Sequence, residues 1–179
     1  MVNKLNIFYN FNIPTKFKKS IILIGNFDGL HSGHQKLFKL AKKYKIKNKS
    51  KVGVVTFDPI PKMFFNTKIK NYRISNFNQK VVCLKKFGVD FLINKKFDKN
   101  FSKITYYKFI KDILSRKLSS KFIFVSNNFR FGHKREGDVA LLKKYENDFG
   151  YNLINPTPLM KNKKIISSTI IRKLLEEGK

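Results

Sequence analysis

Hydrophobic and polar positions follow two alternating patterns along this chain. Residues 20–25 form a continuous apolar run that ends in glycine, which is typical of a strand buried on both faces of a parallel sheet. From Gly33 to about Tyr44, apolar residues recur at helical spacing among lysines. Residues 51–57 then have the composition of a second strand. This part of the chain therefore predicts a β-α-β unit.

The same alternation continues toward the C-terminus. It predicts further helices over residues 76–87, 105–118 and 138–149, further strands over residues 89–94, 121–126 and 151–155, and a last helix from Ser167 to about Glu177. Helices that alternate with short strands predict an α/β fold, a doubly wound, mainly parallel sheet with helices on both faces. A length of 179 residues favours one domain, so we expect a single domain over residues 1–179.

Two connections are longer than usual, residues 58–73 and 127–137. In doubly wound sheets, ligands bind beyond the carboxyl ends of the strands. The segments that directly follow the strands are therefore the candidates for chemistry. There are four of them, at residues 25–34, 56–65, 126–137 and 166–172.

The charge of the chain is strongly basic. Lysine and arginine number 39 against 11 acidic residues, and a formal net charge of +28 favours a nucleic-acid or anionic-membrane partner. However, arginine is rare, and Lys, Asn, Ile and Phe, which all have A/T-rich codons, make up about half of the chain. A base-composition bias of the genome explains the lysines without a selected partner, so we expect no specific nucleic-acid partner.

The number of cysteines and the length of the apolar runs indicate the cellular compartment in which we expect the protein. Cys83 is the single cysteine, and no Cys/His cluster has zinc spacing, which favours a reducing environment. No run approaches the roughly 18 apolar residues that span a membrane. The region over residues 3–12 is too interrupted by polar side chains for a signal-peptide core. We therefore expect a cytoplasmic protein without a membrane partner. The oligomeric state is open, with a monomer as the expectation.

Two of the three histidines, His31 and His34, lie in the first candidate segment, where the predicted helix begins. A helix N-terminus favours an anion, and Gly33 lets a phosphate approach the backbone. Two imidazoles three residues apart project from the same first turn, an arrangement that suits a triphosphate. The spacing of a Walker loop is absent. The alternative is a turn with two solvent-exposed histidines.

Four ordered segments carry a resemblance to a known family. HSGH (31–34) is similar to the His-x-Gly-His signature of the nucleotidyltransferase superfamily. GNFDGLHSGHQKLF (25–38) resembles the opening of bacterial FAD synthetases, the adenylyltransferase part of bifunctional riboflavin kinase/FMN adenylyltransferases. VVTFDPIP (54–61), NNFRFGHKREGD (127–138) and ISSTIIR (166–172) resemble later segments of the same family. The resemblance implies a Rossmann-like nucleotidyltransferase fold.

The resemblance also implies a reaction, ATP plus FMN to FAD plus pyrophosphate, by attack of the FMN phosphate on the α-phosphate of ATP. Because the nucleophile is already an anion, the protein must mainly align the phosphates and neutralise charge, a task for cationic donors. Magnesium is expected to arrive with ATP, held by phosphate oxygens and water, since no carboxylate cluster forms a dedicated cage. The family's kinase barrel would begin where this chain stops, so we expect no riboflavin kinase activity from it.

The site residues that follow from the motifs form three sets. The catalytic residues are expected to be His31, His34, Asn128, Ser168 and Arg172. The nucleotide-binding residues are expected to be Gly25, Phe27, Asp28, Gly29, His31, Gly33, His34, Ser167, Ser168, Thr169 and Arg172. The flavin is expected to contact Phe57, Pro59, Pro61, Asn128, Phe129, Arg130 and Phe131. Two departures from the family pattern, Ser126 for glycine and Ile60 for histidine, fall on the flavin side.

Several alternatives stay open at this point. Ser167–Thr169 could be an ordinary helix cap, Asn128 and Asp28 turn residues, and the phenylalanines core residues. Arg130 could face solvent. The acceptor could be another phosphorylated molecule, such as a pantetheine or nicotinate mononucleotide. From a different class, the chain could be a basic nucleic-acid-binding protein, whose affinity would fall steeply with salt.

Overall fold

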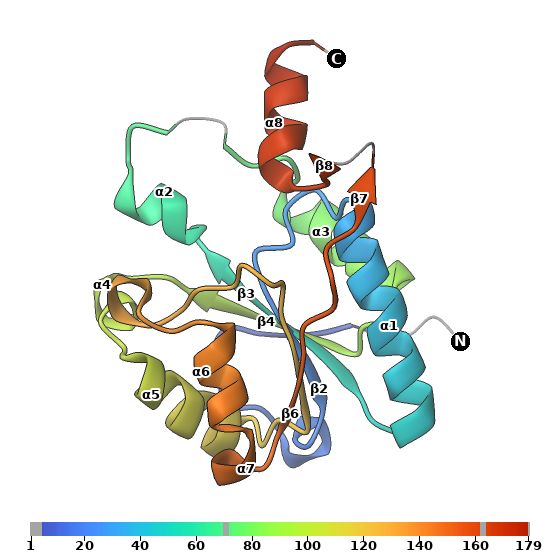
Figure 1. Ribbon diagram of the computed structural model, residues 1–179, viewed down its shortest axis with the longest axis vertical. Coiled ribbons are helices and arrows are strands. Elements are labelled where there is room, and N and C mark those ends of the chain that lie inside the picture. The colour runs from blue at the N-terminus through green and yellow to red at the C-terminus, as the bar shows by residue number, and fades with distance from the viewer. Residues whose placement is uncertain (1–4, 70–71, 162–163, 179) are drawn as a thin grey trace.

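The computed structural model describes residues 5–69, 72–161 and 164–178, and its centre is a six-stranded parallel sheet with helices on both faces (Figure 1). The strand order is β1-β4-β3-β2-β5-β6. The strands of this sheet are β1 (Asn6–Phe8), β2 (Ile21–Ile24), β3 (Val52–Asp58), β4 (Phe91–Lys96), β5 (Phe122–Phe124) and β6 (Asn152–Ile154). A separate antiparallel pair is formed by β7 (Met160–Lys161) and β8 (Lys164–Ile165). The doubly wound α/β fold predicted from the sequence is confirmed.

The helices connect these strands. They are α1 (Ser32–Asn48), α2 (Pro61–Phe65), α3 (Phe77–Lys86), α4 (Lys99–Ser102), α5 (Tyr106–Lys108), α6 (Val139–Lys144), α7 (Glu146–Phe149) and α8 (Ser168–Glu176). Short 3-10 turns occur at η1 (Thr15–Phe17) and η3 (His133–Arg135), and α5 continues into a π-helical stretch, η2 (Phe109–Lys117). Within the described residues, no helix has both the length and the apolar character needed to cross a bilayer.

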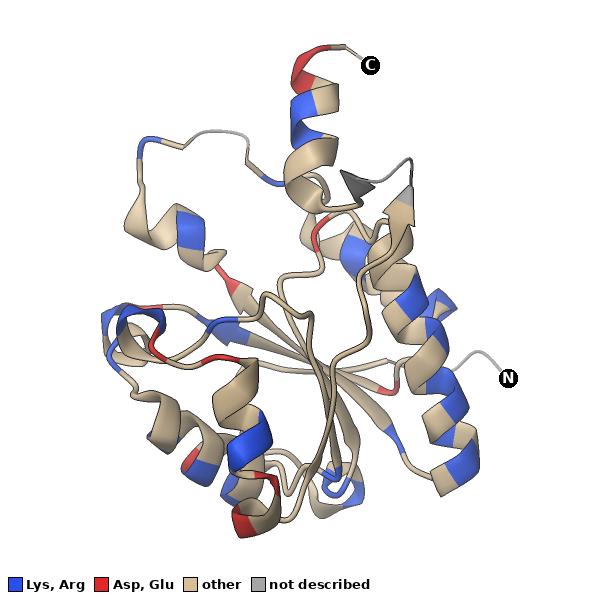
Figure 2. Ribbon diagram, viewed as in Figure 1, with Lys and Arg blue, Asp and Glu red and all other residues tan. Residues whose placement is uncertain are grey.

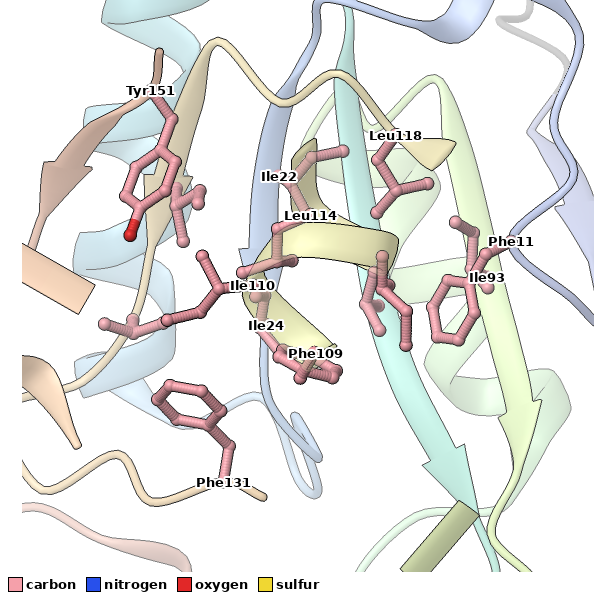
Figure 3. Packing of buried hydrophobic residues seen from close by; sticks show 14 of the residues in the cluster. Phe11, Ile22, Ile24, Ile93, Phe109, Ile110, Leu114, Leu118, Phe131 and Tyr151 are labelled. Atoms are coloured by element: carbon pink, nitrogen blue, oxygen red, sulfur yellow. The ribbon is translucent and has the colours of Figure 1, made fainter. Parts of the chain in front are cut away.

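Both faces of the sheet are buried, as the continuous apolar run at β2 requires. Ile22 and Ile24 point into one core cluster, which is covered by η2 and α6 and is shown in Figure 3. Ile21 and Leu23, the alternate residues of the same strand, join a second cluster under α1 and α3. Since β2 is central and fully covered, its carboxyl end is a rigid base for the loop that follows it.

The strand order places a topological switch point between β2 and β5. The chain passes from β2 to β3 on one side and later returns to β5 on the other side, so the two connections diverge at the carboxyl edge. Ligands of doubly wound proteins bind in the crevice formed at such a point. The segments after β2 and β5, two of the four candidates from the sequence, therefore leave the sheet side by side.

Some elements differ from the prediction. The expected helix over residues 138–149 is divided at Tyr145 into α6 and α7, and the helix from Gly33 extends past Tyr44 to Asn48. The long connection 58–73 contains α2, and residues 70–71 within it lie outside the described part. Element β1 has only three residues and none of them is fully buried, so it has no apolar run to reveal it.

Gly53 in β3 has a packing role that a mutation can test. It pairs in register with Phe91 of β4, and a Cβ added at Gly53 would lie 2.1 Å from Cζ of that fully buried ring. We expect Gly53→Ala to lower the free energy of unfolding by about 1–3 kcal/mol, measured by urea denaturation. In a Phe91→Leu background the same change should cost less, because the ring is gone. An equal cost in both backgrounds would contradict the proposed clash.

Candidate active site

The loop between β2 and α1 has an unusual backbone that is held in place by its own side chains. Phe27, Gly29 and Leu30 all have positive φ angles, of 46°, 75° and 35°. Phe27 and Leu30 are buried in the core cluster under α1, which stabilises a conformation that these residue types rarely adopt. A side chain at Gly29 would come within 2.8 Å of Ile74. The loop is thus fixed before any ligand binds.

Asp28 is the buried centre of this loop. Its carboxylate is 2% exposed and accepts hydrogen bonds from the backbone N–H groups of Ile74 (3.0 Å) and Ser75 (3.1 Å). Arg172 of α8 donates to the same carboxylate through Nη2 at 2.6 Å. Burial alone would raise the pKa of the Asp28 carboxyl, but these donors together hold it below its usual value. Asp28 is therefore ionised, and it joins the loop after β2 to residues 74–75 and to α8.

His31 and His34 lie together at the start of α1. Their rings are stacked with centroids 3.8 Å apart, and Phe27 packs edge-on against His34. His31 is the N-cap residue, and its Nδ1 accepts a hydrogen bond from the backbone N–H of His34 at 3.4 Å. Because Nδ1 is the acceptor, the proton of the neutral His31 ring is on Nε2. The structure thus confirms that the two imidazole rings lie together at the start of the helix, as the sequence predicts.

The charge state of the two histidines differs from the expectation of cationic donors. Burial, together with the neighbouring His31, lowers the pKa of His34 to about 3. Burial also lowers the pKa of His31. In the free protein both rings are therefore neutral at pH 7. In the described structure, His34 Nδ1 is buried and has no hydrogen-bond partner, so this ring nitrogen can still bond to a ligand.

The start of α8 packs onto the same loop. Ser168 Oγ donates to the backbone carbonyl of Asp28 at 3.0 Å, whereas Ser167 is the N-cap of α8 and Thr169 is exposed. Arg172 Nε donates to the carbonyl of Tyr72 at 2.8 Å, and its guanidinium lies over the Tyr72 ring. Of the four predicted residues in this segment, Ser167 caps α8, Ser168 and Arg172 support the loop, and Thr169 faces solvent.

The loop after β5 is organised mainly by aromatic packing. Phe129 and Phe131 are stacked with ring centroids 5.4 Å apart, and Phe131, only 8% exposed, packs on Phe109 in the core (Figure 3). Asn128 accepts a hydrogen bond from Ser126 Oγ at 2.9 Å and is exposed. Arg130 forms an ion pair at 3.0 Å with Asp138, the N-cap residue of α6.

The end of β3 lies on the other side of β2. Phe57 contacts the rings of Phe97 and Phe101 and packs against the same core cluster as Phe129. Pro59 follows a cis peptide bond, and Pro61 begins α2. These residues share the carboxyl edge of the sheet with the histidine loop. Among the described residues the rings of Phe57 and Phe129 form no aromatic pair with each other, and a space for a flat ring between them stays a prediction.

Sequence reasoning missed several residues that complete the site. Tyr72 accepts a hydrogen bond from Arg172, Ser75 Oγ accepts one from the N–H of Gly29, and the N–H of Ile74 donates to Asp28. These three residues lie in an irregular segment without a recognisable pattern. Lys80 of α3 is 7% exposed, and its Nζ donates to the carbonyl of Asn26 at 2.8 Å. Among the described residues, no three His, Cys, Asp or Glu side chains gather where they could hold a metal ion.

A parallel sheet with this switch point, whose histidine loop opens the helix after β2, defines a Rossmann-like α/β protein with a His-x-Gly-His site. Comparison with known proteins then identifies the family. The chain belongs to the FAD synthetase family, which it matches over residues 13–170.

Relatives of known description support the same assignment. A bifunctional riboflavin kinase/FMN adenylyltransferase of Buchnera aphidicola subsp. Acyrthosiphon pisum is 41% identical over 171 residues, which are 93% of this chain and 53% of that protein. A bifunctional riboflavin kinase/FMN adenylyltransferase of Escherichia coli K12 is 34% identical over 157 residues, which are 88% of this chain and 50% of the Escherichia coli protein. The chain thus spans about half the length of these curated relatives.

A solved structure shares the fold. A crystal structure described as that of a macrolide-efflux protein from Streptococcus pneumoniae superposes with a TM-score of 0.83 at 27% sequence identity. The match covers 98% of this chain and 67% of that one.

Proposed function

We propose that this chain is an FMN adenylyltransferase, which converts ATP and FMN to FAD and pyrophosphate. An oxygen of the FMN phosphate forms a bond to the α-phosphorus of ATP, while the bond from that phosphorus to the oxygen bridging to the β-phosphate breaks. Pyrophosphate leaves with the electron pair of that bond. The family match and the four ordered motifs support this reaction. We further propose that residues 1–179 form one adenylyltransferase domain, a cytoplasmic monomer.

One observation carries the proposal: the N-termini of α1 and α8 converge on the loop that holds the stacked histidines. Ser168 at the first turn of α8 bonds to Asp28, and a Cβ at Gly33 in the first turn of α1 would lie 3.3 Å from the carbonyl oxygen of Ile166. Helix α8 has 9 residues and helix α1 has 17, and both begin beside this loop. Their free N–H groups and the positive ends of their dipoles are therefore directed toward the loop. Such a place favours a polyphosphate.

The proposed roles of the residues follow from their contacts. His31, through Nε2–H, and His34 are neutral donors to the α-phosphate and to the departing pyrophosphate, where charge develops. Arg172 and Ser168 hold the loop through Asp28 and add their charge and hydroxyl beside the polyphosphate. Gly25, Gly29 and the other loop residues bring backbone close to ATP.

For the second substrate, we propose that Asn128 and Arg130 contact the FMN phosphate. Phe57, Pro59, Pro61 and Phe129 would line the slot for the isoalloxazine ring, with Phe131 supporting Phe129 from the core. Magnesium enters as part of the ATP substrate. Since the oxygens of Asp28 are already bonded to Arg172, Ile74 and Ser75, this carboxylate is not a free ligand for it.

The test is to incubate the purified chain with FMN, ATP and magnesium and to measure FAD and pyrophosphate. We expect the two products in equal amounts. A folded preparation that yields neither product overturns the proposal. Parallel reactions with phosphorylated pantetheine or nicotinate mononucleotide separate the other acceptor classes: if one of these is adenylylated and FMN is not, the flavin assignment is wrong.

The nucleic-acid alternative is less well supported. Lysines and arginines occur along α1, α3, α6 and α8 (Figure 2), and six other lysines line one hollow beside η1: Lys16, Lys18, Lys19, Lys49, Lys51 and Lys121. The family match gives a nucleic-acid role no support. A basic binding protein would lose affinity for an oligonucleotide by orders of magnitude between low and physiological salt, and its affinity would increase with oligonucleotide length.

A further inference from the structure

Lys80 is a buried cation beside the histidine loop. Its Nζ donates to the carbonyl of Asn26, in the loop after β2, at 2.8 Å and to Thr56 Oγ1, near the end of β3, at 3.3 Å. Thr56 Oγ1 in turn donates to the same Asn26 carbonyl at 3.2 Å. Lys80 thus fastens α3 to the carboxyl ends of two neighbouring strands, at the peptide where the loop begins.

Among the described residues, the positive charge of Lys80 has no carboxylate partner in an ion pair. Lysine is almost never this deeply buried without one, yet Lys80 forms no ion pair within the described residues. The carboxylates that face it are both matched by arginines: Asp28 by Arg172, and Asp58 by Arg73. One positive charge is therefore left over at this place.

The other groups near Lys80 do not neutralise it. His34 of α1 is close enough for the charge of Lys80 to disfavour its protonation, and both histidines are neutral in the free protein. Arg73 is itself a cation and is already paired with Asp58. An anion is the missing complement.

We propose that Lys80 is a positioning residue of this site: its ammonium group fixes the peptide that begins the phosphate-binding loop and leaves there a positive charge that a phosphate-bearing ligand neutralises. Its effect on FAD formation rests on the proposed function, whereas its effect on phosphate binding does not. The residue acts through the Asn26–Phe27 peptide and through its field, because its Nζ is engaged by protein oxygens.

The position of Lys80 has a consequence for pH. Burial lowers its pKa to about 8, against the opposing effect of Asp28. Below that pH the ammonium is charged, and above it the charge and a donor are lost. The pKa values of Asp28 and His34, which face it, are also lowered, so neither group titrates near pH 8. The kcat/KM of the wild type should therefore fall as pH rises through about 8.

The experiment compares wild type, Lys80→Met, Lys80→Arg and Lys85→Met. Lys85 lies on the same helix, is exposed, and gives the same change in net charge. Pyrophosphate and magnesium–ATP binding are titrated by calorimetry, and kcat and KM are followed from pH 6 to 10. We expect Lys80→Met to weaken pyrophosphate binding by about tenfold or more. Lys80→Arg should restore part of that affinity and remove the alkaline fall, since arginine keeps its charge there. Lys85→Met should match wild type.

Each outcome decides a separate point. Pyrophosphate affinity and a pH profile in Lys80→Met that equal those of wild type overturn the inference. If Lys80→Met does not fold, as judged by its melting curve, Lys80→Arg decides alone: an unchanged alkaline fall in this variant overturns the inference. If wild type forms no FAD, the proposed function fails, and the pyrophosphate titrations still test Lys80.

Discussion

Replacing His31 by alanine is expected to lower kcat for FAD formation by about 100- to 1,000-fold, because one well-placed donor to developing charge has an effect of that size. The KM values for FMN and ATP should change much less, since the donor acts mainly in the transition state. Steady-state kinetics with pyrophosphate detection measure both. The melting temperature should fall only slightly, because the main structural loss is one helix cap.

His31→Asn is the matched variant for this experiment. Asparagine is a good N-cap, so it keeps the structural contact to the backbone of His34 and removes only the imidazole. We expect His31→Asn to be nearly as slow as His31→Ala. Recovery of turnover in the asparagine variant would assign His31 to capping and not to the chemistry.

Asp28→Ala is expected to have the largest effect on stability. It leaves the guanidinium of Arg172 and two backbone N–H groups without their acceptor, and breaking a buried ion pair costs about 3–5 kcal/mol. Urea denaturation measures the loss, and FAD formation should fall with it because the loop is no longer held. Asp112→Ala is the control: its pair with Arg116 is exposed, so we expect a loss of about 0.5 kcal/mol or less. Equal losses at the two positions would contradict the role of Asp28.

The lowered pKa of Asp28 also predicts how the stability of the protein changes at acidic pH. The pKa of this carboxyl is lowered in the folded protein, so its contribution to stability is fully present above the unfolded value of 3.8 and is lost as pH falls through the lower, folded value. In the Asp28→Asn variant that contribution is absent at every pH. The difference in unfolding free energy between wild type and this variant should therefore shrink as the solution becomes more acidic. A difference that does not depend on pH would contradict the ionised state of Asp28.

The architecture was predictable where burial is continuous. The run at β2 and the helical spacing in α1 each leave a clear pattern, because a fully covered strand must be apolar throughout and an amphipathic helix apolar on one side. Element β1 and the short helix α4 leave none, since three or four residues with partial burial carry too little pattern. Their positions depend on contacts with distant parts of the chain.

The site was predictable only where its residues form a local motif. His31, Gly33 and His34 are neighbours at a helix start, so one short segment reveals them. Lys80 is hidden by the abundance of lysine, although its spacing holds a signal: it lies three residues after Phe77 and four before Leu84, on the buried face of α3. A charged residue on an apolar stripe is a recognisable anomaly.

The polar attachment of α8 implies an order of assembly. This last helix buries no residue fully, and it is held to the body of the molecule by polar contacts of Ser168 and Arg172, together with the Arg172 guanidinium over the Tyr72 ring. The sheet and both of its apolar layers are complete without it. The sheet and its two apolar layers can therefore form before α8 is made, and the loop after β2 gains its ion pair only once Arg172 reaches Asp28.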